Sequence, residues 1–569
     1  MTDVQTMPWL AHYGDVPATL EYPRITLYEA LARSAEAHPA ATATTFYGST
    51  LTYRELVGAV GECASALSAL GLGRGDRITI SMPTSPQGVI AFYAAAKLGA
   101  VASMIHPLST SSEIADYLVM SRSRIALTLD AFYGSFASIQ SETPLETLVL
   151  ARIGDYLPPA KRVGFWLTKG RKIPRVPPDD SVIWWSAMMA GPCPDVDAAH
   201  VDTDELAAIL YSGGTTGTPK GIMLSHQNFV SEAVQLGAWI GLGPKDTVLG
   251  VLPIFHGFGL AALINAPLMS GAKVVLVPQF SAEIVADLLK KERITLMAGP
   301  PTLYEALARD ESLGKADLSS LRAAFSGADT LQGPVRERFE KVVAAGGGTV
   351  RLLEGYGLTE AVTGIMGMPV DQYREGSIGI PFPDILAKIC APGTSTEAPP
   401  GTEGEICLSG PAVMLGYLDN PEATAETLRE HEDGRIWLHT GDIGTMDEDG
   451  FFYFTSRLKR MIKSSGMNVY PAQVEALLYR HPSVGEACVI GIPDEAQGER
   501  VKAFVVPAEG IDATPELASE LIAYCREHLI KWSCPREIVF RDELPRTRVG
   551  KIDFKALADE ALAPVGSAQ

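Results

Sequence analysis

A glycine-rich polar loop near the middle of the chain has the residue types of a phosphate site. The apolar run 206–211 predicts a strand, and it leads into Ser-Gly-Gly-Thr-Thr-Gly-Thr-Pro-Lys-Gly at 212–221. Closely spaced glycines let a backbone bend sharply and point its N–H groups at an anion. The hydroxyls add hydrogen-bond donors, and Lys220 adds a positive charge. We therefore interpret this segment as a phosphate-binding loop, with a flexible surface loop as the alternative.

The loop fits neither of two common nucleotide-binding motifs. Pro219 stands before Lys220, where a Walker A loop requires glycine, and no Ser or Thr follows the lysine. The dinucleotide motif opens a helix, whereas residues 221–224 are patterned as a strand. The sequence therefore predicts a phosphate site of another kind, set between two strands.

Helical and strand patterns alternate through the first three-quarters of the chain, which is typical of a layered α/β domain. Thr26 with Glu29, and Thr52 with Glu55, match the capping box that begins a helix. We expect strands at 77–82 and 274–277, and helices at 87–98 and 282–290.

The last hundred residues are patterned as a smaller α+β module. Pro471 suits the first turn of a helix, and an apolar stripe follows it. The sequence therefore predicts a large N-terminal domain, 1–457, and a small C-terminal domain, 458–569. In the small domain we expect strands at 487–490, 501–506 and 537–540, and a helix at 517–530.

Length, charge and cysteine content exclude several classes of protein. With 569 residues the chain exceeds what one hydrophobic core usually organises, so at least two domains are expected. A net charge of −20 would repel a phosphate backbone, which argues against nucleic acid as a main partner. The seven cysteines form no Cys-x-x-Cys pair. They argue against a disulfide framework and a structural zinc site, and they indicate a reducing compartment, the cytoplasm.

One stretch without charged residues, 247–272, is long enough to span a bilayer. Pro253, Pro267 and four glycines interrupt it. We therefore expect buried strand, loop and helix pieces there instead of a membrane span.

Tyr211 to Gly221 resembles the signature loop of the AMP-forming adenylate ligase superfamily, which includes acyl-CoA synthetases, luciferases and peptide-synthetase adenylation domains. Further motifs of that superfamily follow in order over almost the whole chain. They are Gly-Tyr-Gly-Leu-Thr-Glu at 355–360, Gly-Glu-Ile at 404–406, Gly-Pro at 410–411, Gly-Tyr at 416–417, Pro-Glu-Ala-Thr at 421–424, Thr-Gly-Asp at 440–442, Arg-Leu-Lys at 457–459, and Pro-Arg-Thr to Gly-Lys at 545–551.

The resemblance implies a two-step reaction. A carboxylate attacks the α-phosphate of ATP, which gives an acyl-adenylate and pyrophosphate, and a thiol then displaces AMP. Magnesium is the implied metal and coenzyme A the implied thiol, so the protein must mainly position anions and offset their charge.

The resemblance also assigns nucleotide contacts. Tyr356 would lie against adenine, Asp442 would accept the ribose hydroxyls, and Arg457 would contact ribose or phosphate. A core tyrosine, an Asx turn and a surface arginine are the respective alternatives. The full set implied for ATP and AMP is Ser212, Gly213, Gly214, Thr215, Thr216, Gly217, Lys220, Gly327, Ala328, Asp329, Gly355, Tyr356, Gly357, Asp442 and Arg457.

Four residues are implied to be catalytic. Lys551 would bridge the substrate carboxylate and the α-phosphate, because a flexible lysine can reach into a cleft as a point charge. Glu360, beside Thr359, would hold Mg²⁺, with Thr216 as a second ligand. His256 corresponds to a family histidine near the acyl pocket and the CoA channel, and a satisfied core histidine is the alternative.

Lys551 can serve the first half-reaction and leave for the second only if the small domain moves. The family reorients this domain about a hinge, which corresponds here to Lys459. The sequence departs from the common family pattern at Ser456 and in the stretch after Lys463, without removing a catalytic group. The residues that would then face the thiol channel are Lys463, Ser465 and Gly466.

The segment 159–185 resembles the corresponding insert of long-chain fatty-acid synthetases. Within it, 161–175 holds six basic residues and no acidic one. We interpret 161–175 as an arm that contacts anionic membrane at its inner face, with a solvated linker as the alternative. A medium- or long-chain fatty acid is the expected substrate. An aryl or other bulky-acid CoA ligase and a non-catalytic acyl or nucleotide binder are the alternatives, and a free carrier protein as acceptor and a homodimer are left open.

Overall fold

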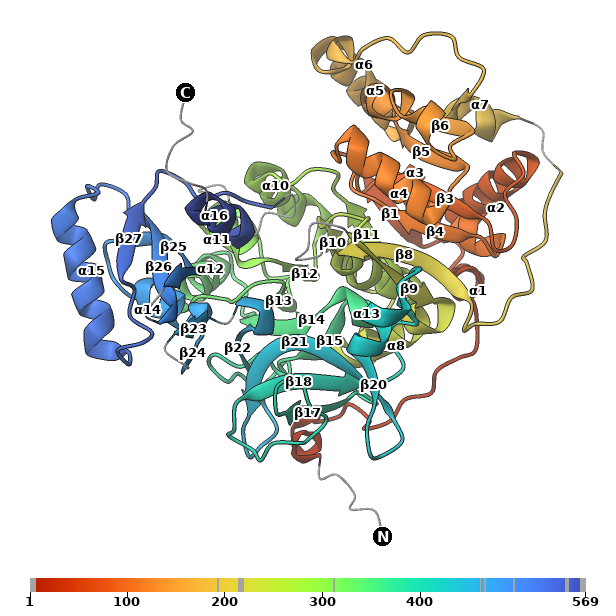
Figure 1. The fold of residues 1–569 in the computed structure, drawn as a ribbon. Coiled ribbons are helices and arrows are strands. Elements are labelled where there is room, and N and C mark those ends of the chain that lie inside the picture. The colour runs from red at the N-terminus through yellow and green to blue at the C-terminus, as the bar shows by residue number, and fades with distance from the viewer. Residues whose placement is uncertain are drawn as a thin grey trace. The chain divides into compact units, whose positions relative to one another are not determined.

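The computed structural model describes residues 7–191, 194–212, 219–310, 313–460, 462–464, 467–494, 497–547 and 552–562 (Figure 1). The contacts within the chain divide it into two compact units. The larger unit comprises 1–386 and 409–438, and the smaller unit comprises 387–408 and 439–569. Both units mix helices and strands, so the predicted α/β class with a large and a small part is confirmed.

One sheet of the larger unit is built around parallel strands. Strands β1 and β10 to β14 pair in parallel, whereas the edge strands β2, β15 and β16 pair antiparallel. Parallel strands end at a common edge, so the segment after β13, which holds 327–329, emerges beside the end of β14 and the turn after it, which hold 355–360. The strand order is β16 (Ile380–Pro381), β15 (Gly364–Gly367), β14 (Leu352–Gly357), β13 (Ala323–Ser326), β12 (Leu296–Gly299), β10 (Thr247–Gly250), β11 (Lys273–Leu276), β1 (Thr42–Phe46) and β2 (Ser49–Thr52).

The other sheet of the larger unit carries the phosphate loop. Strand β9 runs antiparallel to β8, so the predicted strand–loop–strand arrangement is confirmed. From β8 to β7 the neighbouring strands pair in parallel. The order is β19 (Gly416–Tyr417), β9 (Lys220–Ser225), β8 (Leu206–Ser212), β4 (Val101–Met104), β3 (Arg77–Ser81), β5 (Ile125–Leu129), β6 (Thr147–Ala151) and β7 (Val182–Trp184).

A single hydrophobic cluster joins the two sheets of the larger unit. Helix α3 (Pro86–Lys97) is buried along its whole length and contributes to this cluster together with residues of β1, β3, β8 and β11. Helices α1 (Leu27–Ala37) and α2 (Tyr53–Ala69) begin at the predicted capping boxes. Further helices of this unit are α4 (Ser111–Ser121), α5 (Tyr133–Ala137), α6 (Pro159–Thr168), α7 (Trp185–Ala190), α8 (His226–Ile240), α10 (Ala282–Glu292), α11 (Pro301–Arg309), α12 (Gly333–Ala345) and α13 (Pro421–Thr427).

The uncharged stretch 247–272 forms buried pieces, as expected. It contains β10, a π-helical segment η6 (Phe258–Asn265) and helix α9 (Ala266–Met269). π-Helical segments are rare and often occur at functional sites, and this one begins two residues after His256. In the part of the chain that the structure describes, no helix is long and apolar enough to cross a membrane.

The smaller unit contains one sheet that carries the Thr-Gly-Asp motif. Strands β17 (Leu386–Cys390), β18 (Gly404–Ser409), β21 (Ile436–Met446) and β22 (Phe452–Arg457) follow one another in that order. Strand β20 (Leu428–Glu430) pairs with 436–438, and both of these segments belong to the larger unit.

The second sheet of the smaller unit forms the predicted C-terminal α+β module. Helix α14 (Pro471–Leu478) begins at Pro471, as expected. Strands β25 and β26 are longer than predicted because they form one continuous ladder, from Val484 opposite Pro507 to Asp494 opposite Gly498. The elements are β24 (Met467–Val469), β23 (Ile462–Ser464), β26 (Gly498–Pro507), β25 (Val484–Asp494) and β27 (Glu537–Phe540), with helices α15 (Pro515–His528) and α16 (Phe554–Leu562).

The boundary after residue 457 and the hinge at Lys459 concern how two domains move. They stay predictions, because the division by contacts measures how residues pack and not how domains turn.

Candidate active site

The two ends of the phosphate loop are held together by the β8–β9 hairpin. Ser212 lies opposite Lys220 in the strand register, and Tyr211 lies opposite Gly221. The hairpin therefore places the hydroxyl and the lysine at the base of the loop. The other predicted loop contacts lie outside the described residues and stay predictions; they are Gly213, Gly214, Thr215, Thr216 and Gly217.

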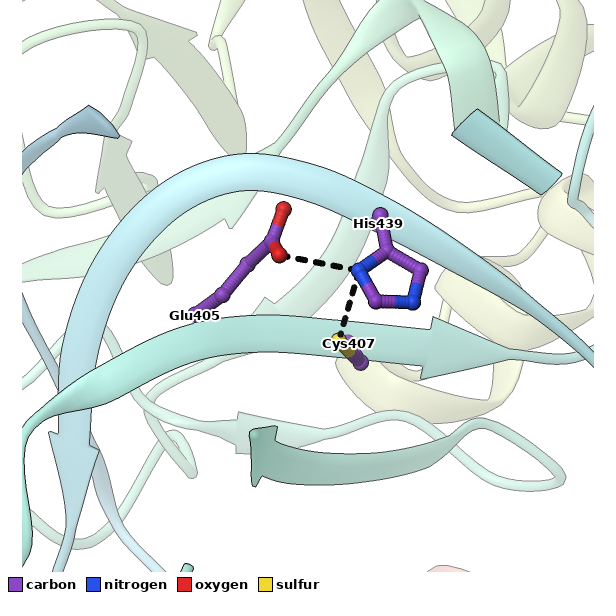
Figure 2. A group of neighbouring side chains, drawn as sticks. All are labelled: Glu405, Cys407 and His439. Atoms are coloured by element: carbon purple, nitrogen blue, oxygen red, sulfur yellow. Dashed lines mark hydrogen bonds and ion pairs between the residues drawn. The ribbon is translucent and has the colours of Figure 1, made fainter. Parts of the chain in front are cut away.

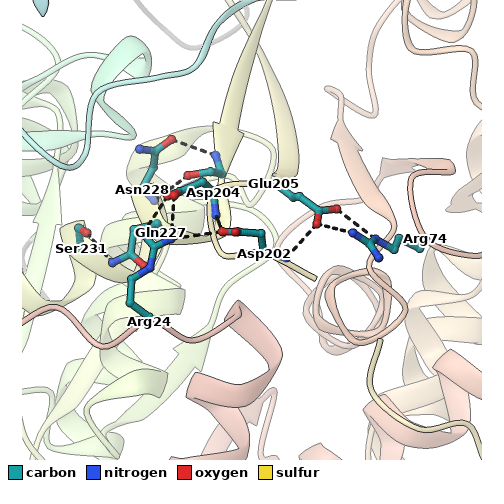
Figure 3. Close-up of polar contacts among 9 residues, drawn as sticks. Arg24, Arg74, Asp202, Asp204, Glu205, Gln227, Asn228 and Ser231 are labelled. Atoms are coloured by element: carbon teal, nitrogen blue, oxygen red, sulfur yellow. Dashed lines mark hydrogen bonds and ion pairs between the residues drawn. The ribbon is translucent and has the colours of Figure 1, made fainter. Parts of the chain in front are cut away.

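Charged side chains tie down the turn that precedes β8 (Figure 3). Arg24 Nη2 donates to Asp204 Oδ2 at 2.7 Å, and Arg74 Nη2 donates to Glu205 Oε1 at 2.6 Å. Both pairs are exposed, so water and salt screen them and they contribute little to stability. Their effect is to fix where the strand begins.

Asn228 connects the end of β9 to the segment that contains Glu360. Its Oδ1 accepts the Ser225 N–H at 2.9 Å, which caps helix α8. Its Nδ2 donates to the carbonyl oxygens of Pro411 and Val413, both at 2.9 Å. The next residue, Met414, donates its N–H to the carbonyl oxygen of Glu360 at 2.8 Å. A continuous line of hydrogen bonds therefore runs from the phosphate hairpin to Glu360.

Tyr417 brings Lys220 and Glu360 together. Strand β19 places Tyr417 opposite Ile222 of β9. The Tyr417 hydroxyl donates to Glu360 Oε1 at 2.9 Å, and Lys220 Nζ lies 4.3 Å from the centre of the Tyr417 ring. Burial and the Glu360 carboxylate raise the pKa of Tyr417, which keeps the hydroxyl protonated as a donor. The sequence assigned no role to Tyr417; the Gly416-Tyr417 motif was the signal for it.

Glycines allow the His256 loop and the Thr-Glu loop to touch backbone to backbone. A β-carbon at Gly257 would lie 2.2 Å from the Val362 carbonyl oxygen, and one at Gly357 would lie 1.5 Å from the Thr363 carbonyl oxygen. Val362 is β-branched and buried, yet it has φ +64° in a γ-turn that the Thr363 N–H closes onto Ala361. Strain of this kind persists only where packing enforces it.

The segment after β13 packs against the loop that begins at Gly355 and against Phe258. A β-carbon at Gly327 would lie 3.1 Å from the Gly355 carbonyl oxygen and 3.4 Å from the Phe258 ring. Ala328 has φ +71°, a left-handed conformation that is uncommon outside glycine, and Asp329 is exposed beside it. The structure thus brings the backbones of Gly327 and Gly355 together, and a nucleotide contact there stays a prediction.

His256 is half-buried at the start of the π-helical segment. Its Nδ1 accepts the Phe258 N–H at 3.2 Å. The neighbouring Phe255 ring lies 4.4 Å from the ring of His106. The role of His256 at the acyl pocket stays a prediction.

Tyr356 and Thr359 occupy the strand end and the short turn of the Gly-Tyr-Gly-Leu-Thr-Glu motif. Tyr356 pairs with Met366 across β14 and β15 and is half-buried, and Thr359 begins the 3₁₀ turn Thr359–Ala361. Just before them, burial raises the pKa of Glu354 to about 7, although Arg336 acts in the opposite direction.

Asp442 and Arg457 form an ion pair in the smaller unit. They lie directly opposite each other in β21 and β22, and Arg457 Nε is 3.0 Å from Asp442 Oδ1. The Asp442 side chain is 1% exposed, whereas that of Arg457 is 57% exposed. The structure therefore brings the Thr-Gly-Asp and Arg-Leu-Lys motifs together, and their roles at ribose and phosphate stay predictions.

A buried group of three side chains on β18 and β21, Glu405, Cys407 and His439, was not found from the sequence (Figure 2). His439 Nδ1 donates to Glu405 Oε2 at 2.8 Å and lies 3.6 Å from the Cys407 sulfur. Although burial alone would raise it, the pKa of Glu405 is held below its ordinary value by His439 and by the Gly441 N–H. His439 follows Cys407 by 32 residues and Glu405 by 34 in the sequence. The pairing of β18 with β21 brings them together.

The predicted hinge and CoA residues lie on short elements of the smaller unit. Lys459 belongs to the 3₁₀ turn Leu458–Arg460, and Lys463 is exposed on β23, where its N–H donates to Glu499 Oε2 at 2.6 Å. Arg546 and Ile552 form an isolated antiparallel β-bridge. They stand on either side of the segment that contains Lys551. Lys551, Ser465 and Gly466 themselves lie outside the described residues.

Comparison with known proteins decides the family. The model of the AMP-binding enzyme family matches residues 31–418, and that of the AMP-binding enzyme C-terminal domain matches 473–551. The chain belongs to the AMP-binding enzyme family. The resemblance to AMP-forming adenylate ligases is thereby confirmed.

Relatives and solved structures agree along the whole length. The chain is 36% identical over 570 residues to a long-chain-fatty-acid–CoA ligase of Bacillus subtilis, covering 97% of this chain and 98% of that one. It is 35% identical to the ligase of the same name from Salmonella typhimurium, covering 98% and 99%. The ATP-bound structure of MatB from Rhodopseudomonas palustris superposes with a TM-score of 0.82 at 28% identity, covering 95% and 99%. This family member is an AMP-forming acyl-CoA ligase, and ATP and CoA are its substrates.

Glu232, on α8, is a buried carboxyl group that the sequence did not single out. Its Oε1 accepts the Gly364 N–H at 3.2 Å, and its Oε2 has no hydrogen-bond partner among the described residues. Burial raises the pKa of Glu232 to about 8, although the Gly364 N–H acts in the opposite direction. The group is therefore held protonated behind the strand that follows the Thr-Glu loop.

Glu232→Gln should change how stability depends on pH. In the unfolded chain the carboxyl group has its ordinary pKa of 4.5, and in the fold the pKa is about 8, so the folded state binds one more proton between these values. Wild-type stability should therefore fall as pH rises through this range, and the variant should lack that fall. Thermal unfolding midpoints of both proteins from pH 5 to 8.5 measure it.

The exposed helical carboxylate Glu337, changed to Gln, serves as the control and should run parallel to the wild type. Parallel curves for Glu232→Gln and the wild type would show that Glu232 titrates normally.

Proposed function

We propose that this chain activates a long-chain fatty acid with ATP and transfers the acyl group to coenzyme A. The observation that carries the proposal is the cluster at the base of the phosphate loop, where Tyr417 joins the Lys220 cation to the Glu360 carboxylate. A cation and a metal-binding group beside a phosphate loop are what phosphoryl chemistry needs. The choice of a fatty acid is supported by the full-length relatives, which are named long-chain-fatty-acid–CoA ligases.

In the first half-reaction, a carboxylate oxygen of the fatty acid forms a bond to the α-phosphorus of ATP. The bond from that phosphorus to the pyrophosphate oxygen breaks, and pyrophosphate leaves. Lys220 offsets phosphate charge from the loop base, and Lys551 contacts the acid and the α-phosphate. Tyr356 lies against adenine, and Asp442 accepts the ribose hydroxyls.

Glu360 suits Mg²⁺, because carboxylate oxygens are the ligands that this ion prefers and the Tyr417 hydroxyl orients one of them. When bound there, the ion would neutralise charge on the phosphates. In the second half-reaction the sulfur of CoA forms a bond to the acyl carbon, the bond to the AMP oxygen breaks, and the thiol proton is released. Before that step, rotation at Lys459 brings Lys463, Ser465 and Gly466 to the thiol channel.

A second candidate substrate is an aromatic acid. The chain is 36% identical over 534 residues to a feruloyl-CoA synthase from Amycolatopsis, covering 91% of this chain and 96% of that one. If the substrate is aromatic, the acyl pocket of the present chain would be bounded by Phe255 and Phe258, the aromatic residues around His256.

We also propose that helix α6 and the turn after it contact anionic membrane. Val163, Trp166 and Leu167 follow helical spacing and are 58%, 58% and 49% exposed, so they form one apolar stripe. Basic residues flank the stripe, and Arg171 lies 4.8 Å over the Trp166 ring. Exposed Trp and Leu beside basic groups are typical of a helix that lies in a membrane interface.

A panel of carboxylic acids with ATP and CoA tests the substrate. We expect the highest kcat/KM for long-chain fatty acids, measured as AMP release, with benzoate and ferulate at least about tenfold lower, equal to about 1.4 kcal/mol of discrimination. Activity confined to the aromatic acids would favour the second candidate. Failure of ATP–pyrophosphate exchange with every acid would leave only a binding role.

Lys551→Ala should separate the half-reactions. Removing a charge that acts on the transition state should lower adenylation by about 10²–10³-fold, while thioester formation from supplied acyl-AMP falls much less. ATP–pyrophosphate exchange and single-turnover thioester assays measure the two steps. Lys555→Ala, on α16, is the control and should leave both unchanged, and normal adenylation in Lys551→Ala would exclude the assigned role.

Cosedimentation with vesicles tests the membrane contact. Lys161 donates to the Tyr47 carbonyl at 2.8 Å, so the variant should spare it and change Lys169, Lys172 and Arg175 to Ser. Each basic residue near an anionic surface adds about 1 kcal/mol, so binding to phosphatidylglycerol vesicles should fall by about two orders of magnitude. Serine at Lys290, Lys291 and Arg293 is the charge-matched control. Equal binding of the wild type and the α6 variant to the vesicles would contradict the proposed membrane contact.

A further inference from the structure

Glu405 lies behind the turn that leads to Asp442. Its side chain is 4% exposed, and both of its oxygens have partners. Oε2 accepts from His439 Nδ1 at 2.8 Å, and Oε1 accepts the Gly441 N–H at 2.9 Å. A carboxylate this buried requires such partners, so the three groups hold one another in a single arrangement.

A second layer of hydrogen bonds fixes the same turn. The Thr440 hydroxyl donates to the Ile406 carbonyl oxygen at 2.7 Å and accepts the Asp442 N–H at 3.0 Å. Gly441 has φ +69°, which glycine adopts without steric cost. Residues 405 and 406 of β18 therefore contact each of the three residues that precede Asp442.

We propose that Glu405 is a positioning residue for adenylation: by holding His439 and Gly441 it keeps the Asp442 carboxylate oriented toward the ribose hydroxyls of ATP. This inference rests on the proposed function, because it takes Asp442 to be the ribose ligand. A side chain held in place beforehand loses less conformational freedom when the nucleotide binds. Glu405 acts here through the backbone and not by contact with ATP.

The group formed by Glu405, Cys407 and His439 also has donor atoms that suit a transition metal, all within 4.8 Å of one another. Their hydrogen bonds already explain this closeness. His439 Nδ1 is engaged with Glu405, and the second Glu405 oxygen is engaged with Gly441. Positioning therefore accounts for the geometry with this chain's own residues.

The test compares ATP with 2′,3′-dideoxy-ATP, which lacks both ribose hydroxyls. In ATP–pyrophosphate exchange with a long-chain fatty acid, Glu405→Ala should raise the KM for ATP by about ten- to a hundredfold and change kcat and the KM for the acid much less. With dideoxy-ATP its effect should be within about threefold, because the contact that Glu405 supports is not made. Glu405→Gln keeps an acceptor for Gly441 and should restore most of the preference for ATP.

Asp447→Ala is the matched control, at the other end of the β21–β22 hairpin. Asp447 accepts the Phe451 N–H and the Tyr453 hydroxyl, both at 2.9 Å, so its loss should lower the unfolding midpoint without changing the preference for ATP over dideoxy-ATP. If Glu405→Ala does not fold, Glu405→Asp, which is too short to reach both partners, should still reduce that preference.

Equal loss with ATP and dideoxy-ATP in the Glu405 variants would make Glu405 merely structural and overturn the proposal. An active wild type whose Asp442→Ala variant keeps its preference for ATP would also overturn it, while leaving the proposed function intact. If the wild type shows no ATP–pyrophosphate exchange with any acid, both the proposed function and the positioning role of Glu405 are wrong.

Discussion

The candidate site depends on close contact between backbones, which only residues without a β-carbon permit. Gly257 and Gly357 lie where any side chain would overlap the carbonyl oxygens of Val362 and Thr363. This contact holds the γ-turn at Val362 in its unfavourable φ, and it fixes the loop that carries Thr359 and Glu360. The position of the implied metal ligand is therefore set by backbone packing within its own loop, where Gly357 meets Thr363, and against Gly257, about a hundred residues earlier.

Hydrogen bonds to the backbone then place the charged groups on this frame. Asn228 ties the end of the phosphate hairpin to 411–413, Met414 binds the Glu360 carbonyl, and the two-residue strand β19 sets Tyr417 between Lys220 and Glu360. A cation and a carboxylate that face one aromatic side chain are kept at fixed places without a direct ion pair. Both therefore remain able to act on phosphate.

The smaller unit uses the same means. The Glu405 carboxylate, buried and paired, restrains the turn before Asp442, and Asp442 in turn faces the exposed Arg457. These local charges do not follow from the net charge of −20. The net charge argues only about the class of binding partner, against nucleic acid. The basic segment 161–175 is a further local exception to that average. The exposed Trp166 within it would not have been noticed from charge alone.

Sequence by itself determined the elements and the chemistry. Capping boxes at Thr26 and Thr52, the strand–loop–strand pattern around Lys220 and the helix start at Pro471 are local signals, so each could be predicted from a few neighbouring residues. The order of the motifs indicated the family for the same reason. The lengths of β25 and β26 were underestimated most, because a ladder extends as far as its partner strand allows.

Tertiary structure decided which side chains meet. The contacts of Tyr417 with Glu360, of Glu405 with His439, and of Glu232 with Gly364 join residues 57, 34 and 132 positions apart. No local pattern encodes such pairs, because they depend on which strands become neighbours and in which register. The sequence thus named the residues that could bind a phosphate, a ribose and a metal ion, and the sheet order determined which buried groups hold them in place.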